Sequence, residues 1–359
     1  MTAVFRPLAI SAVAARTAVG GGSAQTASSI RAGLSRFGAH PTYQALCRDP
    51  EWEDPEPLNV AAAPGIDPAL AAAERLHALL IPVLADLMQT ASLHRRDLAQ
   101  CALLLALPAP DEAVASWRLA ETFVAELSRR TGLTFKTTRQ SISGHASGLE
   151  LLAEASALLA SGEVQSCLLA GVDSNLDPHR LALLDEAYRV KSARNVDGFC
   201  PGEAACALLL EGPRQRRGGT IKATISALGL GLEPEPLRSE KVSTGAGLVQ
   251  ALRGALPPEG SPDFLLCDLD GQSYRAFEWG IAQARLGARL EGLGRAVMPA
   301  RSVGDVGAAT GPLLLATAVE AFERGWAPGE EALIFTGSEG PLRAAARVSG
   351  SGPGKAERR

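Results

Sequence analysis

Histidine is scarce in this sequence and is confined to its first half. The chain of 359 residues has 5 histidines, and none of them lies beyond residue 179. They are His40, His77, His94, His145 and His179. Because histidine is the side chain that titrates near neutral pH, its absence excludes a histidine acid, base or metal ligand from residues 180–359.

Aromatic residues, excess positive charge and long apolar runs are also scarce. Aromatics make up 4% of the residues, so the 46% hydrophobic fraction must fill the core mainly with Ala, Leu, Val and Ile. A formal net charge of -4 argues against a nucleic-acid partner. No apolar run reaches the roughly 18 residues of a membrane span. Arg6 and Arg16 interrupt the N-terminal segment, which predicts a strand and no signal peptide, so we expect a cytoplasmic protein.

The 6 cysteines lack the CxxC spacing of metal or redox sites. They are Cys47, Cys101, Cys167, Cys200, Cys206 and Cys267. Three of them lie inside apolar runs typical of strands, so we interpret the set as buried, reduced thiols. We therefore expect neither a cofactor nor a resident metal.

Strands alternate with helices along most of the chain, which predicts an α/β fold. In the first half we expect strands at 3–13, 100–107, 134–142, 166–174 and 205–212, with helices at 23–34, 69–90, 111–130 and 145–162. In the second half we expect strands at 221–230, 263–271, 332–337 and 343–348, with helices at 245–256, 274–287 and 311–325. A segment rich in proline and acidic residues, 38–68, predicts a surface excursion.

The repeated order of elements suggests two similar halves. A polar, glycine-rich run at 212–220 is the predicted boundary between them. We expect an N-terminal half at 1–213 and a C-terminal half at 214–349, and a disordered tail at 350–359.

Four segments carry a family resemblance through their common order and spacing. They are TAVG with SIRAGLSRF at 17–37, SGHASGL at 143–149 before the strand CLLAGVDS, DGFCPGEAA at 197–205, and GDVGAATG at 304–311. Together they resemble the β-ketoacyl synthase branch of the thiolase superfamily. The resemblance implies a thiolase-like fold, with two duplicated α/β halves in an α-β-α-β-α layered arrangement, and a dimer formed through the N-terminal half.

The same resemblance places the family's three catalytic positions on other residue types. The acyl-carrying cysteine falls on His145, and the two histidines fall on Asp270 and Asp305. An acyl-imidazole is labile to water, and ionised aspartates oppose the negative charge that develops at an oxyanion position. The resemblance also points to a substrate-binding set, which is Phe199, Cys200, Ser338 and Glu339.

These replacements predict a synthase-like protein that has lost decarboxylative condensation. It would bind an acyl group or an acyl carrier protein, or act as a partner subunit. We expect it to form either a homodimer or a heterodimer with an active synthase. His145 would then be a buried polar residue bound to Asp270 or Asp305.

Several alternatives stay open at the level of sequence. His145 with Asp270 or Asp305 could serve an active acyltransferase or thioester hydrolase. The same three side chains could hold a metal ion, and Cys200 could replace the lost nucleophile. The chain could also be an assembly or structural protein of a multi-gene system.

Overall fold

The computed structural model describes residues 4–45, 56–70, 72–110, 116–193, 195–212, 220–291, 293–294 and 296–351. Its strands are β1 Leu8–Thr17, β2 Gly38–Ala45, β3 Glu56–Val60, β4 Cys101–Ala106, β5 Thr137–Ser141, β6 Ser166–Ser174, β7 Glu203–Glu211, β8 Ala223–Leu232, β9 Phe264–Cys267, β10 Glu331–Gly337 and β11 Leu342–Gly350. Its α-helices are α1 Ser23–Arg31, α2 Ala72–Thr90, α3 Ser116–Thr131, α4 Ser147–Ala160, α5 Pro178–Glu186, α6 Ala246–Ala255, α7 Ser273–Leu286, α8 Ala300–Val303 and α9 Thr310–Glu323. The predicted alternation of strands and helices is confirmed.

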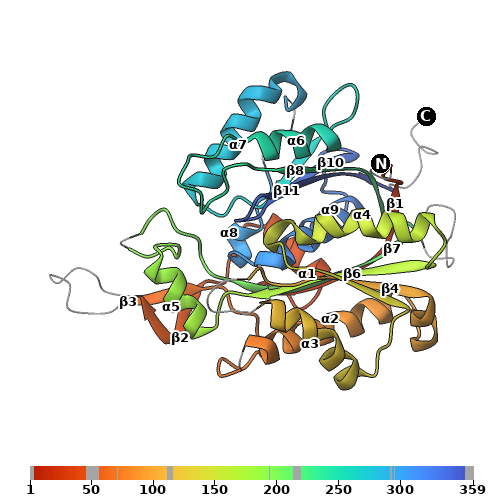
Figure 1. Cartoon of the computed structure of the whole chain (residues 1–359), viewed down its shortest axis with the longest axis horizontal. Coiled ribbons are helices and arrows are strands. Elements are labelled where there is room, and N and C mark those ends of the chain that lie inside the picture. Colours follow the sequence, from red (N-terminus) through yellow and green to blue (C-terminus); the bar gives the residue numbers. More distant parts are fainter. Residues whose placement is uncertain are drawn as a thin grey trace.

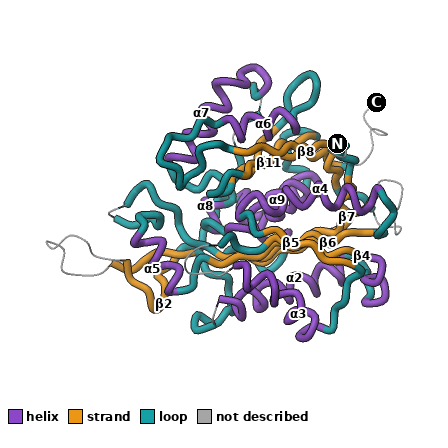
Figure 2. The backbone as a smooth tube through the Cα atoms, viewed as in Figure 1, coloured by secondary structure: helices purple, strands orange, loops and turns teal. Residues whose placement is uncertain are grey.

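The main sheet has nine strands in the order β5-β4-β6-β7-β1-β8-β11-β10-β9. It folds back on itself between β1 and β8, where Leu8–Ile10 pairs with Ala223–Ile225. Helices α4 and α9 lie between the two stacked parts, while α2 and α3 cover one outer face and α6 and α7 cover the other (Figures 1 and 2). The expected α-β-α-β-α layering is confirmed.

The two parts of the sheet repeat one pattern of strand directions. In the first part β5, β4 and β6 are parallel, and β7 and β1 continue antiparallel. In the second part β9 and β10 are parallel, and β11 and β8 continue antiparallel. A single parallel bridge between Leu266 and Val297 stands beside β9, where the first part has β5. This correspondence makes α4 and α9 equivalent helices.

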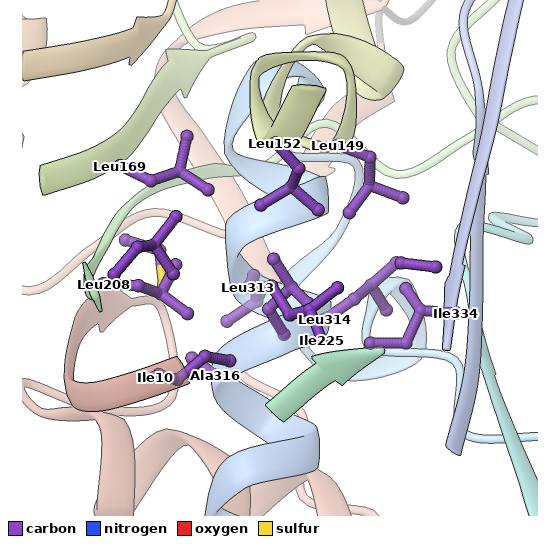
Figure 3. Close-up of a cluster of buried hydrophobic side chains, with 14 of the residues drawn as sticks. Ile10, Leu149, Leu152, Leu169, Leu208, Ile225, Leu313, Leu314, Ala316 and Ile334 are labelled. Atoms are coloured by element: carbon purple, nitrogen blue, oxygen red, sulfur yellow. The ribbon is translucent and has the colours of Figure 1, made fainter. Parts of the chain in front are cut away.

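The central helices meet through small residues and aliphatic side chains. A Cβ at Gly148 of α4 would overlap the ring of Pro312 on α9, so only glycine lets the helices approach this closely. Leu152, Leu313 and Leu314 fill the space around this crossing, between the two sheet parts (Figure 3). The close crossing also brings together the N-terminal ends of both helices, where two of the predicted site residues lie.

The segment 38–68, predicted as a surface excursion, lies at the edge of the molecule in its described part, with most of β2 exposed (Figure 1). It forms a separate two-stranded antiparallel sheet from β2 and β3. Leu58 and Val60 of β3 are buried in a small cluster with Leu181 of α5. Their alternation with polar residues gives one apolar face, which the high proline and acidic content of the segment obscures.

Some expectations fall on residues outside the described part of the chain. These are Cys47, most of the predicted boundary at 212–220 and all but the first two residues of the tail at 350–359. Four of the other cysteines are buried free thiols and Cys200 is half-buried. Within the described ranges, none of the helices combines the length and the apolar character needed to cross a membrane.

Candidate functional site

His145 lies in a tight 3-10 turn, Gly144–Ala146, that leads into α4. Gly144 has a φ of +80°, a left-handed conformation that glycine adopts without strain. The Ala146 N–H donates to the Ser338 hydroxyl at 3.1 Å, which ties the turn to the loop after β10. His145 is buried, with 9% of its side chain exposed. The backbone therefore holds the imidazole at a defined place beside the loop after β10.

Asp305 lies just before the corresponding 3-10 turn that leads into α9. Its N–H donates to the carbonyl of Cys200 at 2.8 Å. Its carbonyl accepts the N–H of Gly202 at 2.9 Å and the side-chain amide of Asn175 at 2.9 Å. Three backbone-anchored contacts thus fix the position from which the carboxylate projects.

The imidazole of His145 and the carboxylate of Asp305 form a close, buried pair. Nε2 lies 2.9 Å from both Oδ1 and Oδ2. Burial alone disfavours a charged imidazole, but the facing carboxylate outweighs it and raises the pKa of His145. Burial likewise opposes ionisation of Asp305, yet His145 lowers the pKa of that carboxyl, which also accepts the Gly307 N–H at 2.8 Å. The carboxylate therefore favours the protonated imidazole over the neutral one.

Arg275 is the central cation of the site, and the sequence interpretation missed it. From the first turn of α7, its Nη1 donates to Asp268 at 2.8 Å and its Nε to Asp270 at 3.0 Å. Nη1 also donates to the carbonyl of Gly337. Nη2 lies 3.3 Å from Nδ1 and 3.2 Å from Nε2 of His145, so it rests against the ring instead of aligning with one lone pair. The sequence did contain a signal for Arg275. A cation in the first turn of a helix opposes the helix dipole, so an arginine at this position of α7 indicates nearby acidic partners.

Asp270 is not the partner of His145. Its carboxylate accepts from Arg275 and from the backbone and side chain of Gln272. Burial raises the pKa of Asp270 despite the opposing effect of the guanidinium. The sequence left the choice between two aspartates open, and the structure assigns the imidazole to Asp305.

The guanidinium also occupies the region where a metal ion would have to bind. It contacts Asp270, Asp268 and His145, which are the acidic and imidazole groups of the site. Within the described residues, no group of three or more His, Cys, Asp or Glu side chains is arranged to hold a metal ion. The side chains present therefore do not fit the metal-binding alternative.

A cavity of about 510 Å³ opens beside the pair. His145 and Asp305 line it together with Phe199 and Glu339 of the predicted substrate-binding set. Ser338 and Cys200 are absent from its lining. Ser338 is buried behind the His145 turn, and burial raises the pKa of the Cys200 thiol, which makes it a poor nucleophile.

The arginines of the cavity wall also contact carboxylates. Arg180 binds Asp173 at 2.8 Å, and Arg189 binds Glu339 at 2.9 Å. Arg238, with 67% of its side chain exposed, lies 3.8 Å from the second oxygen of Glu339 at the rim. Although burial opposes its ionisation, Arg189 lowers the pKa of Glu339. The wall thus presents ion pairs instead of free cations.

No protein-family model matches the chain, and no curated protein matches it. Solved structures match it over nearly its whole length. One is a chain of AntDE:AntF, a type II polyketide synthase acyl-carrier protein in complex with its ketosynthase bound to the hexaketide, at 13% identity and a TM-score of 0.76, covering 97% of this chain and 100% of that chain. Another belongs to the ishigamide ketosynthase/chain length factor, at 19% identity and a TM-score of 0.71, covering 96% and 99%.

A third structure is the oxazolomycin ketosynthase domain OzmH KS7 of Streptomyces albus JA3453, at 14% identity and a TM-score of 0.71, covering 97% of this chain and 75% of that chain. These likenesses confirm the resemblance at the level of the fold. The chain has the thiolase-like fold of ketosynthases and of a chain length factor.

Proposed function

We propose that this chain is a ketosynthase-like protein that binds an acyl thioester or an acyl carrier without catalysing decarboxylative condensation. The observation that carries the proposal is the hydrogen bond that the Asp305 carboxylate accepts from Nε2 of His145, which lies 2.9 Å from both carboxylate oxygens. A nucleophile or general base needs a free lone pair. Here Nε2 faces a carboxylate and Arg275 Nη2 lies within 3.3 Å of both ring nitrogens, so neither nitrogen offers a free lone pair to the cavity.

The remaining groups do not restore the lost chemistry. Condensation requires a carrier for the acyl chain and donors for the developing enolate oxygen. Cys200 lies outside the cavity lining, and Asp305 presents negative charge to the cavity. Loss of a single oxyanion donor typically slows such a reaction by a factor of about 10² to 10³. We therefore expect no condensation product above the uncatalysed background.

The cavity and the sheet edge support the binding and pairing roles. A volume of about 510 Å³ can enclose a short acyl chain. In the described part of the sheet, β5 is an edge strand, and an exposed edge can pair with another chain. One similar structure is a ketosynthase/chain length factor and another holds an acyl-carrier protein with its ketosynthase, which fits a heterodimer or carrier-binding role. A homodimer would use the same edge.

The test combines mass spectrometry with a product assay. The protein is incubated with acetyl- and malonyl-pantetheine thioesters, alone and with a purified ketosynthase. We expect the mass of the protein to stay unmodified and the protein alone to give no ketoacyl product. When the added ketosynthase is its partner, light scattering should show a complex larger than either protein alone. A stable acyl adduct that turns over to a ketoacyl product would refute the proposal.

A second candidate function is thioester hydrolysis or acyl transfer. It is favoured by one observation, the His145–Asp305 pair at the wall of an open cavity. A thioesterase assay should compare the wild type with His145→Ala, using His179→Ala at an exposed position as the matched control. Equal, negligible rates in all three proteins would eliminate the enzyme. A rate lost only in His145→Ala would establish it instead.

A further inference from the structure

We infer that the cavity selects neutral acyl groups and rejects acyl groups that end in a carboxylate, such as malonyl. This inference rests on the proposed function and defines the ligand class of the same site. It follows from the charge pairing around the cavity, from its apolar wall and from the carboxylates that face its base.

The deep cations of the lining each have a carboxylate partner. His145 has Asp305 at 2.9 Å, and Arg180 has Asp173 at 2.8 Å. All four residues line the cavity. A ligand carboxylate that reached this depth would compete with a bound protein carboxylate for the same cation. The protein carboxylate, whether displaced or still in place, would then repel the ligand carboxylate at close range.

The outer part of the cavity follows the same pattern. Arg189 is bound to Glu339 at 2.9 Å, and Arg238 approaches the other oxygen of that carboxylate. Glu339 therefore offsets the charge of one of the two arginines that would otherwise attract an anion. Glu186, also in the lining, adds a further negative charge at an exposed position.

Apolar side chains complete the wall. Leu183 and Leu184 come from α5, and Leu237, Phe199 and Pro110 come from loops around it. An apolar wall favours an alkyl or ketoacyl chain because burial of apolar surface is the main favourable contribution to binding. The apolar wall thus favours a neutral chain, while the deep basic groups already contact carboxylates.

The experiment compares two probes of nearly equal size. They are the acetoacetyl and malonyl amide analogues of pantetheine, in which an amide replaces the thioester and prevents hydrolysis. Binding to the full chain is measured by isothermal titration calorimetry at neutral pH. We expect the acetoacetyl analogue to bind at least about tenfold more tightly than the malonyl analogue. Equal or tighter binding of the malonyl analogue, or no binding of either, would overturn the inference.

Two variants separate charge pairing from general electrostatics. Glu339→Gln releases Arg189 and Arg238 and should reduce the preference at least about threefold, chiefly by tightening the malonyl analogue. Glu163→Gln removes the same charge at an exposed position outside the cavity lining and should leave the preference within about twofold. An equal effect of the two variants would contradict the assigned role of Glu339.

This outcome is independent of the test of condensation. An acyl adduct that turns over to product would refute the proposed function while leaving the measured preference intact. A preference for the malonyl analogue would refute the charge selectivity even if the protein proved unable to condense acyl groups.

Discussion

Arg275 provides the most stringent test of the ion-pair network. Its side chain is 4% exposed and donates hydrogen bonds to Asp268, to Asp270 and to the carbonyl of Gly337. Replacement by methionine keeps an unbranched chain of similar length but removes every charged donor. Two buried carboxylates then lose their cation at once.

The expected cost follows from that loss. Removing one partner of a buried ion pair typically costs about 3–5 kcal/mol, because an uncompensated charge stays behind. We therefore expect Arg275→Met to lower the free energy of unfolding by about 3–5 kcal/mol. Asp270 already has a raised pKa through burial, and loss of the guanidinium raises it further. Since the unfolded carboxyl titrates near pH 4, the penalty is present at neutral pH and shrinks as the pH falls toward that value.

The assay is urea denaturation followed by circular dichroism at pH 7 and pH 5. Arg253→Met, at an exposed position of α6, is the matched control and should change the free energy of unfolding by less than about 0.5 kcal/mol. Should Arg275→Met fail to fold, the triple variant that adds Asp268→Asn and Asp270→Asn should recover a folded protein, because no buried charge is then left unpaired. A cost below about 1 kcal/mol for Arg275→Met would refute the reasoning.

Two further predictions concern the His145 pair and the crossing of the central helices. The raised pKa of His145 makes its contribution to stability complete below about pH 6.5 and lost as the pH rises through the higher folded value. Asp305→Asn should therefore reduce the loss of stability that the wild type shows as the pH rises above about 6.5. An unchanged dependence of the free energy of unfolding on pH, measured by urea denaturation, would contradict the pairing. Gly148→Ala should destabilise by about 1–3 kcal/mol, because its Cβ overlaps Pro312. Gly280→Ala, in a helix with open space around it, should be neutral or stabilise by up to about 1 kcal/mol, and equal effects in thermal unfolding would count against the crossing.

Local patterns predicted much of the fold because each depends on residues close in the chain. Alternation and helical periodicity placed most strands and helices of both halves. They left the two strands within 38–68 unassigned, because buried positions such as Leu58 are set by contact with α5, more than 100 residues away in sequence. The glycine-rich turns before α4 and α9 were recognisable because a left-handed φ favours glycine wherever it occurs.

The sequence by itself determined what the site lacks, since no histidine follows residue 179 and the positions of the family's catalytic set hold His145, Asp270 and Asp305. Only the tertiary structure decided which aspartate meets the imidazole and that Arg275 takes the other. The physical reason is the distance along the chain over which each property is set. Residue type and turn geometry are local properties, whereas the partner of a buried charge depends on where folding brings segments 130 to 160 residues apart.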